Sequence, residues 1–188
     1  MNICVYGAAS DNITPVYIHQ VEKLGELMAE NGHGLIFGAG AHGLMGAVAR
    51  GVHAKGGRIV GIVPRFFQSE GIIFPYCTEL HRTDTMRTRK QMMEERADAF
   101  VMVPGGIGTY EEFFEILTLK QLGRHGKPIA ILNVNGYFEP LRALLAHTIT
   151  EGFLSERCWD LFHFCEKPEE ILATLTEAQP PCVPLKPV

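Results

Sequence analysis

The sequence lacks the patterns that mark several large classes of protein. Its five cysteines are scattered and form no Cys-x-x-Cys pair, which argues against a zinc site or a redox disulfide and favours reduced thiols. Its eight histidines include no His-Glu-x-x-His motif, so we expect no metal site. No apolar run reaches transmembrane length, and the first residues carry neither the basic segment nor the long apolar stretch of a signal peptide. These absences predict a cytoplasmic protein that interacts with no membrane.

The chain also has no excess of positive charge. Its formal net charge is -4 and its pI is about 6.1, so nucleic acid is not an expected partner, and a bound phosphate would have to be met by local groups. A length of 188 residues with 46% hydrophobic side chains suits one packed domain. We see no internal repeat or linker. We therefore expect a single domain over residues 1–178 and a tail over 179–188, where four prolines prevent regular structure.

Short apolar runs rich in β-branched residues alternate with segments of helical period. This alternation predicts an α/β fold with a parallel sheet and crossover helices. The predicted strands are 3–6, 35–37, 58–63, 99–103 and 129–132, with an edge strand near 161–164. The predicted helices cover 18–28, 44–55, a segment capped by Asp84, a segment from Thr109 to Leu122, 141–149 and 168–175. The helix from Thr109 has an apolar surface wide enough to contact a partner chain as well.

Two glycine turns join a predicted strand to a predicted helix. The first, residues 38–43, has the G-x-G-x-x-G spacing of dinucleotide-binding folds, and Gly40 and Gly43 are its candidate ligand contacts. That fingerprint requires an acidic residue about 20 positions later, and residues 62–65 contain none. Arg65 in this region is a candidate contact for the 2'-phosphate of NADP. Three interpretations of the first turn therefore stay open: an NADP site, a mononucleotide site or a purely structural turn.

The second turn, residues 104–109, directly follows the apolar strand 99–103. Its glycines allow the backbone to approach a ligand closely, and Thr109 adds a hydroxyl. In an open α/β sheet this is the carboxyl end of a strand, where ligands bind. A structural alternative is a capping box, because Thr109 and Glu112 have the Thr-x-x-Glu spacing that caps a helix without any substrate.

A third segment, residues 86–90, places cations on an apolar helix face. Positions 86, 89, 90 and 93 share one face, so Arg89 and Lys90 lie beside Met86 and Met93. A cation there needs a partner or an anionic ligand, because an unpaired buried charge costs several kcal/mol. The alternatives are an anion site, a buried salt bridge, or side chains that extend to the rim.

Together, Met-x-x-Arg-Lys at 86–90 and Pro-Gly-Gly-x-Gly-Thr-x-x-Glu at 104–112 resemble the paired signature of the LOG (Lonely Guy) family. Its members are cytokinin riboside 5'-monophosphate phosphoribohydrolases, formerly labelled lysine decarboxylases. The resemblance extends over roughly residues 3–175. The chain departs from the family where Arg87 replaces a frequent histidine, and at residues 38–40 and 7–10, where Ser10 is the nearest match to a family hydroxyl.

The resemblance implies a Rossmann-like, doubly wound parallel sheet with helices on both faces, and a homodimer with its sites near the subunit interface. It also implies hydrolysis of the N-glycosidic bond of AMP or N6-substituted AMP, without a cofactor. Arg89 and Glu112 would be the catalytic pair, and the turn at 105–109 would hold the phosphate. The predicted substrate contacts are Met86, Lys90, Gly105, Gly106, Ile107, Gly108, Thr109, Ser10, Gly40 and Gly43.

The chemistry of this reaction suits these residue types. Breaking a ribosyl C–N bond builds positive charge on the sugar, which a fixed carboxylate such as Glu112 stabilises while directing a water. Arg89 would orient that carboxylate or the nucleotide, because a guanidinium stays charged and holds a planar anion at two points. The alternative functions are a nucleotide-binding or carrier protein that cuts no bond, and an NADP-dependent enzyme.

Overall fold

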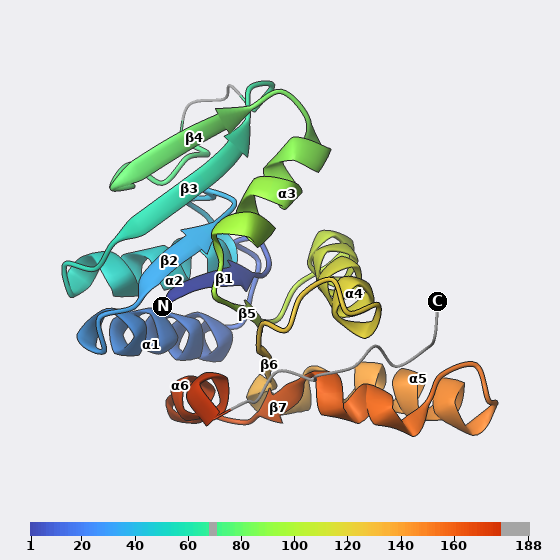
Figure 1. Cartoon of the computed structure of the whole chain (residues 1–188). Helices are drawn as coiled ribbons and strands as arrows, with labels where there is room; N and C mark the ends of the chain where they lie inside the picture. The colour runs from blue at the N-terminus through green and yellow to red at the C-terminus, as the bar shows by residue number, and fades with distance from the viewer. Residues whose placement is uncertain (68–70, 178–188) are drawn as a thin grey trace.

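The computed structural model describes residues 1–67 and 71–177 of the chain. Its centre is a seven-stranded parallel sheet in the order β4-β3-β2-β1-β5-β6-β7 (Figure 1). The strands are β1 (Asn2–Tyr6), β2 (Gly34–Phe37), β3 (Ile59–Pro64), β4 (Glu79–Thr83), β5 (Ala99–Met102), β6 (Ile129–Leu132) and β7 (His163–Cys165). The predicted parallel α/β fold is confirmed. The proline-rich segment 179–188 lies outside the described residues.

Helices lie on both sides of the sheet and connect most of these strands. They are α1 (Pro15–Glu30), α2 (Gly43–Ala54), α3 (Met86–Arg96), α4 (Ile107–Gln121), α5 (Glu139–Thr150) and α6 (Pro168–Glu177), with short 3-10 helices η1 (Val134–Gly136) and η2 (Glu156–Leu161). Their bounds agree closely with the predicted segments. Within the described residues, none of these helices is long and apolar enough to span a bilayer.

Two local predictions at strand and helix ends need correction. Strand β4 was not expected, because Glu79–Thr83 contains mostly polar residues that alternate in burial at the edge of the sheet, with no apolar run to mark them. Helix α3 is not capped by Asp84. Thr85 is its N-cap and forms a capping box with Thr88, so the first turn is stabilised one residue later than expected.

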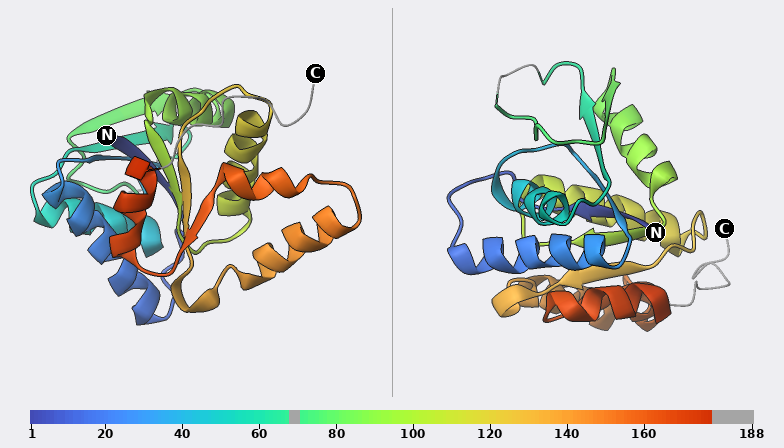
Figure 2. Two further views of the ribbon diagram at one scale, coloured as in Figure 1. Left: turned by 60° about the horizontal axis from the view of Figure 1, so that its bottom comes forward. Right: turned by 90° about the vertical axis from the view of Figure 1, so that its left-hand side faces the viewer.

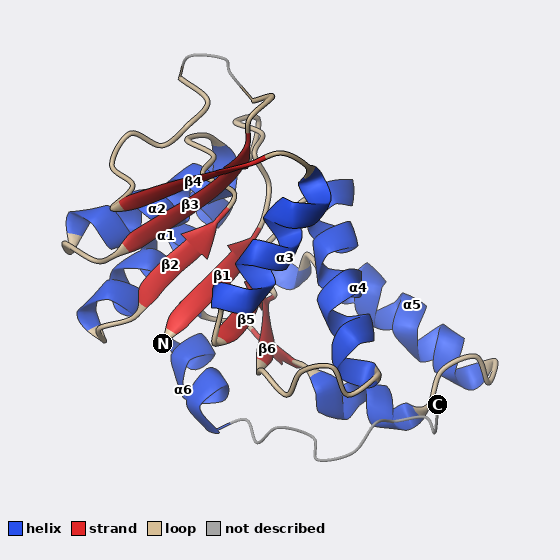
Figure 3. Ribbon diagram, turned by 45° about the horizontal axis from the view of Figure 1, so that its top comes forward, coloured by secondary structure: helices blue, strands red, loops and turns tan. Residues whose placement is uncertain are grey.

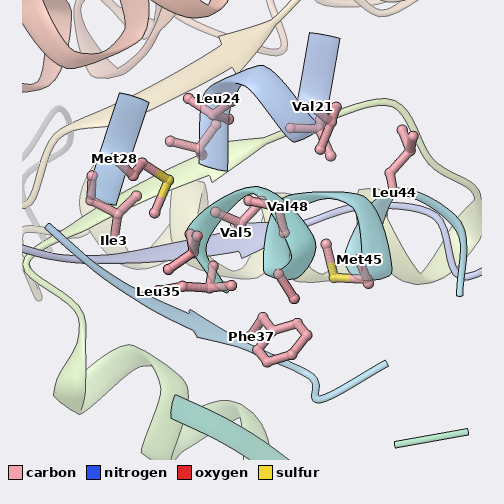
Figure 4. Packing of buried hydrophobic residues seen from close by; sticks show 14 of the residues in the cluster. Ile3, Val5, Val21, Leu24, Met28, Leu35, Phe37, Leu44, Met45 and Val48 are labelled. Carbon is pink, nitrogen blue, oxygen red and sulfur yellow. The ribbon is translucent and has the colours of Figure 1, made fainter. Parts of the chain in front are cut away.

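Successive side chains of a strand point to opposite faces of the sheet, so each face carries its own apolar core. In β1, Ile3 and Val5 belong to the core shared with α1, α2 and α6, whereas Cys4 and Tyr6 belong to the core shared with α3, α4 and α5. Figure 2 and Figure 3 show α3 on one face of the sheet and α1 with α2 on the other. Figure 4 shows the first core, where side chains of α1 and α2 pack onto β1 and β2.

The strand order reverses at one point of the sheet, and in open α/β sheets ligands usually bind at such a point. The chain builds outward from β1 to β2, β3 and β4 on one side, and then returns to place β5, β6 and β7 on the other. The order therefore reverses between β1 and β5. The loops that follow β1 and β5 diverge at such a switch point and leave a crevice at the carboxyl ends of the strands. Both glycine turns lie at this edge, because each follows a strand.

Candidate active site

A cavity of about 500 Å³ opens at the carboxyl ends of β1, β2 and β5. One side is apolar, and the other is formed by glycine turns and a pair of charged side chains. The apolar side consists of Met45, Val63, Pro64, Phe67, Ile72 and Ile73. The remaining lining residues come from the loop after β1, both glycine turns, α3 and α4. An apolar pocket with a few convergent polar groups is the usual form of a small-molecule site.

Arg89 of α3 and Glu112 of α4 form an ion pair in the wall of this cavity. Arg89 Nη1 lies 2.9 Å from Glu112 Oε1, and the two side chains are only 11% and 13% exposed. Arg89 Nε also donates to the carbonyl of Ile62 at 3.1 Å, which fixes the plane of the guanidinium. The prediction that a cation on this apolar face needs a partner is confirmed. The pair joins residues from two helices that flank the cavity.

Gly38 makes room for this arginine. A Cβ atom at position 38 would lie 2.1 Å from Arg89 Nη2, so only glycine allows the guanidinium to occupy its place against the first turn. The sequence does not predict this contact, because G-x-G-x-x-G spacing points to a ligand rather than to a side chain 51 positions away.

Glu112 has an unusual environment for a carboxyl group. Burial raises its pKa above the ordinary value of 4.5, and the Arg89 guanidinium opposes that increase. A carboxylate with few water contacts and one fixed cation is held in a defined orientation. It interacts more strongly with a charge that develops nearby than an exposed carboxylate does.

The first turn of α4 presents backbone amides that have no acceptor in residues 1–67 and 71–177. Gly106 is the N-cap and supplies no side chain, and Tyr110 is the first residue whose N–H bonds back to the carbonyl of Gly106. Within the described residues, the N–H groups of 106–109 have no acceptor. The capping box anticipated for Thr109 and Glu112 is absent, because α4 begins at Ile107 and both residues already lie inside the helix. The side chains of Thr109 and Glu112 instead line the cavity.

The first turn of α2 is different, because its amides are occupied. The N–H of Gly43 donates to Asp11 Oδ1 at 2.9 Å. The N–H groups of Leu44 and Met45 both donate to the carbonyl of Ala8, at 2.8 and 3.1 Å. The backbone of Gly43 has φ of 59°, the left-handed conformation that favours glycine, and a Cβ there would lie 2.6 Å from two carbonyl oxygens. This glycine therefore serves the packing of the loop after β1 against α2.

The structure brings most of the predicted site residues together. The cavity is lined by Ser10, Gly40, Met86, Arg89, Gly106, Gly108, Thr109 and Glu112. Gly105 lines a neighbouring cavity of about 300 Å³. Three predicted residues lie outside both linings: Gly43, Ile107, which is 90% exposed, and Lys90, which pairs with Glu111 and with Glu115 at 2.8 Å.

Further residues at the site were not found in the sequence. Phe67, Ile72 and Ile73 belong to the connection between β3 and β4, which has no periodic pattern that would mark it as a cavity wall. Arg65, the candidate for a 2'-phosphate contact, pairs with Asp84 at 3.0 Å and does not line the cavity. A separate cavity of about 560 Å³ between α5 and η2 contains none of the predicted residues.

Solved structures establish the class of fold. The molybdenum cofactor carrier protein of Chlamydomonas reinhardtii superposes with a TM-score of 0.72 and 21% identity, covering 94% of this chain and 96% of that chain. The molybdenum cofactor binding protein of Rippkaea orientalis superposes with a TM-score of 0.71 and 20% identity, covering 93% and 94%. At these identities the likeness shows the fold alone. The protein is a Rossmann-like α/β protein.

Sequence relatives establish the family. The family described as "Possible lysine decarboxylase" matches residues 45–175. A cytokinin riboside 5'-monophosphate phosphoribohydrolase of Arabidopsis thaliana is 34% identical over 95% of this chain and 82% of its own length. An enzyme of the same name from Rhodococcoides fascians is 35% identical over 93% and 88%. The chain belongs to this family, the LOG phosphoribohydrolases, as the two motifs predicted.

Proposed function

We propose that this protein hydrolyses the N-glycosidic bond of a purine nucleoside 5'-monophosphate, either AMP or AMP substituted at N6. The products are the free base and ribose 5-phosphate. One observation carries the proposal: amides at the start of α4 that have no partner in the described part of the chain line the same cavity as the buried carboxylate of Glu112, one helical turn apart. One turn rises about 5.4 Å, so a phosphate at the amides would bring its ribose next to Glu112.

The start of α4 is suited to the phosphate. Amides 106–109 converge at the positive end of a 15-residue helix, where a phosphate is stabilised by hydrogen bonds and by the helix dipole. Gly106 and Gly108 have open space where a Cβ would stand, so an anion can approach the backbone closely. Holding the phosphate here would position the sugar over the reacting groups, which converts binding energy into orientation.

Glu112 and Arg89 are proposed to act on the sugar. As the bond from C1' to the base breaks, its electron pair leaves with the base, and positive charge builds on C1' and the ring oxygen. The carboxylate of Glu112 would stabilise this charge and direct a water whose oxygen bonds to C1'. The water loses a proton, and the departing base gains one. Arg89 would hold the carboxylate in place through the 2.9 Å ion pair.

The base would lie on the apolar side of the cavity. Val63, Pro64, Phe67, Ile72 and Ile73 form a surface that suits a flat heterocycle or an apolar N6 substituent. Met86 extends this surface from α3, and Ser10 and Gly40 contribute polar and backbone groups at the rim. Ile107 would contact the phosphate through its backbone N–H alone, whereas Gly43 and Lys90, whose polar groups bond to Asp11, Glu111 and Glu115, lie outside this proposed substrate site.

The experiment is a product assay on the purified protein. Incubation with AMP and with N6-isopentenyl-AMP should release free base and ribose 5-phosphate in equal amounts, detected by chromatography. Adenosine, which lacks the phosphate, is the matched control and should react much more slowly. Tight nucleotide binding with no product would instead favour the nucleotide carrier. Binding of NADP in preference to AMP would instead support an NADP-dependent enzyme, which the Arg65–Asp84 ion pair does not favour.

We also propose a homodimer in the cytoplasm. Large apolar side chains such as Ile107, Leu144 and Phe153 are exposed on the isolated chain, and a second copy would cover such surface. The wide apolar face of α4 is partly explained within the chain, because Phe113, Ile116 and Leu117 are buried in the core. Light scattering after gel filtration measures the assembly, and a mass of about 20.8 kDa would contradict a dimer.

A further inference from the structure

Tyr137 connects a distant part of the chain to the second glycine turn. It directly follows η1, in the segment after β6. Its hydroxyl donates to the carbonyl oxygen of Gly105 at 2.8 Å. Its ring packs edge-on against Tyr17 of α1, with centroids 5.9 Å apart, and against Phe138, with centroids 4.9 Å apart. Aromatic contacts on two sides hold the hydroxyl in place, so this hydrogen bond is made by a rigid donor.

This hydrogen bond fixes the direction of an amide in the turn. The described residues contain no cis peptide bond, and in a trans peptide the C=O and the N–H point in opposite directions. The carbonyl of Gly105 points to Tyr137, so the N–H of Gly106 in the same peptide points away from Tyr137. Tyr137 lines the 300 Å³ cavity, and Gly106 lies between that cavity and the larger one that contains Glu112.

The turn needs such a restraint because its backbone has little preference of its own. A Cβ on Gly105 would lie 2.1 Å from Thr109 Oγ1 and 2.9 Å from the amide nitrogen of Ala8, so packing requires glycine there. Gly106 follows, and two adjacent glycines allow the peptide between them to rotate at low cost. The preceding carbonyl, of Pro104, is already held by the Ala8 amide at 3.0 Å. The Gly105 carbonyl is held by Tyr137.

We propose that Tyr137 is a positioning residue that keeps the Gly106 amide directed at the phosphate of the substrate. This inference rests on the proposed function, because it requires a phosphate at the start of α4. With the peptide rotated, the carbonyl oxygen of Gly105 would face the phosphate and repel it, and one donor would be lost. Tyr137 does not line the cavity that contains Glu112, so we expect its effect to be specific to the phosphate group.

The test compares Tyr137→Phe with wild type and with Tyr17→Phe. Both variants remove one hydroxyl from the same aromatic pair, but the Tyr17 hydroxyl makes none of the hydrogen bonds that hold the turn. Dissociation constants for ribose 5-phosphate, AMP and adenosine are measured by calorimetry, with Glu112→Gln added to each protein when AMP is the ligand, because AMP is the proposed substrate. For Tyr137→Phe we expect about 3- to 10-fold weaker binding of the two phosphorylated ligands, the usual effect of one lost hydrogen bond. Binding of adenosine should be unchanged.

The kinetic readout separates positioning from a general loss of structure. Tyr137→Phe should raise the KM for AMP by a similar factor and change kcat less than about 2-fold, with Tyr17→Phe close to wild type. Equal losses for AMP and adenosine, or unchanged binding of ribose 5-phosphate, would overturn the role of Tyr137. If wild type binds ribose 5-phosphate but cuts no nucleotide, the hydrolase proposal fails while the binding comparison still decides about Tyr137. If wild type binds no phosphorylated ligand, both proposals fail.

Discussion

The two glycine turns have similar sequences and similar places in the fold, but they differ in what their amides do. Each follows a buried strand and opens a helix at the same edge of the sheet. At α2 the amides of Gly43, Leu44 and Met45 bond to Asp11 and Ala8. At α4, within the described part of the chain, amides 106–109 have no acceptor. A glycine motif at a helix start therefore does not define an anion site. In the proposed function, the free donors at the start of α4 define the phosphate site.

The glycines of the first turn allow close packing of other groups against the backbone. Asp11 already supplies the carboxylate that the start of α2 attracts, and the pKa of Asp11 is lowered chiefly by its hydrogen bond from Gly43. Gly38 accommodates the Arg89 guanidinium. On this view the first turn positions the arginine and the second binds the phosphate. Substitutions in the two turns should therefore have different consequences.

The largest effect is expected at the carboxylate beside the second turn. Glu112→Gln keeps the shape and a hydrogen-bond acceptor for Arg89 but removes the negative charge. Turnover of AMP should fall about 100-fold or more, the scale of a group that stabilises charge in the transition state. Circular dichroism should show an intact fold. Activity within a few-fold of wild type would mean that the carboxylate does not act on the sugar.

Arg89→Ala should cause a comparable loss at neutral pH, together with a shift in pH dependence. The proposed reaction needs Glu112 ionised, so the raised pKa of Glu112 should place the acid limb of the rate profile above the ordinary value of 4.5. Arg89 lowers this pKa, so its removal should move the acid limb to higher pH. Arg96→Ala, at the other end of α3, is the matched control. An unshifted limb would contradict the electrostatic role of Arg89.

Gly38→Ala tests the first turn as the support of the arginine. The new methyl group would overlap Arg89 Nη2, which is the end of a flexible side chain, so we expect the arginine to move and the fold to persist. Turnover should fall roughly 10-fold, because misplacing a positioning group weakens catalysis without removing it. The melting temperature and the affinity for ribose 5-phosphate should change little. A large loss of phosphate affinity would place phosphate at the first turn instead.

The smallest effect is expected for Asp11→Ala. It frees the amide of Gly43, which should lower the melting temperature slightly and leave the affinity for AMP unchanged. The pKa of Asp11 is below its ordinary value of 3.8 in the folded protein, so its contribution is present above that value and is lost as the pH falls through the folded pKa. Thermal melts of both proteins should therefore converge at low pH. Weaker AMP binding at neutral pH would indicate that the loop after β1 acts in binding.

Much of the molecule is predictable from local pattern. The strands of the sheet interior are short apolar runs, and the helix ends at Asn31 and Gly56 carry glycine or asparagine signals, so β1, β2, β3, β5, β6 and most helices were placed closely. Strand β4 was missed because an edge strand needs no apolar run. The demand of Arg89 for a partner followed from its position on an apolar helix face. The ion pairs of Lys90 with Glu111 and Glu115, which keep Lys90 out of the cavity lining, could not be predicted from its position on the helix.

By itself the sequence determined the α/β order, the two glycine turns, and the family motifs that pair Arg89 with Glu112, because these depend on residues close together along the chain or on the resemblance. Only the tertiary structure decided which turn has free amides and what each glycine accommodates. Asp11 reaches Gly43 across 32 positions, and Tyr137 reaches Gly105 across 32. Such contacts form when strands far apart in the chain become neighbours in the sheet, and spacing in the sequence carries no record of them.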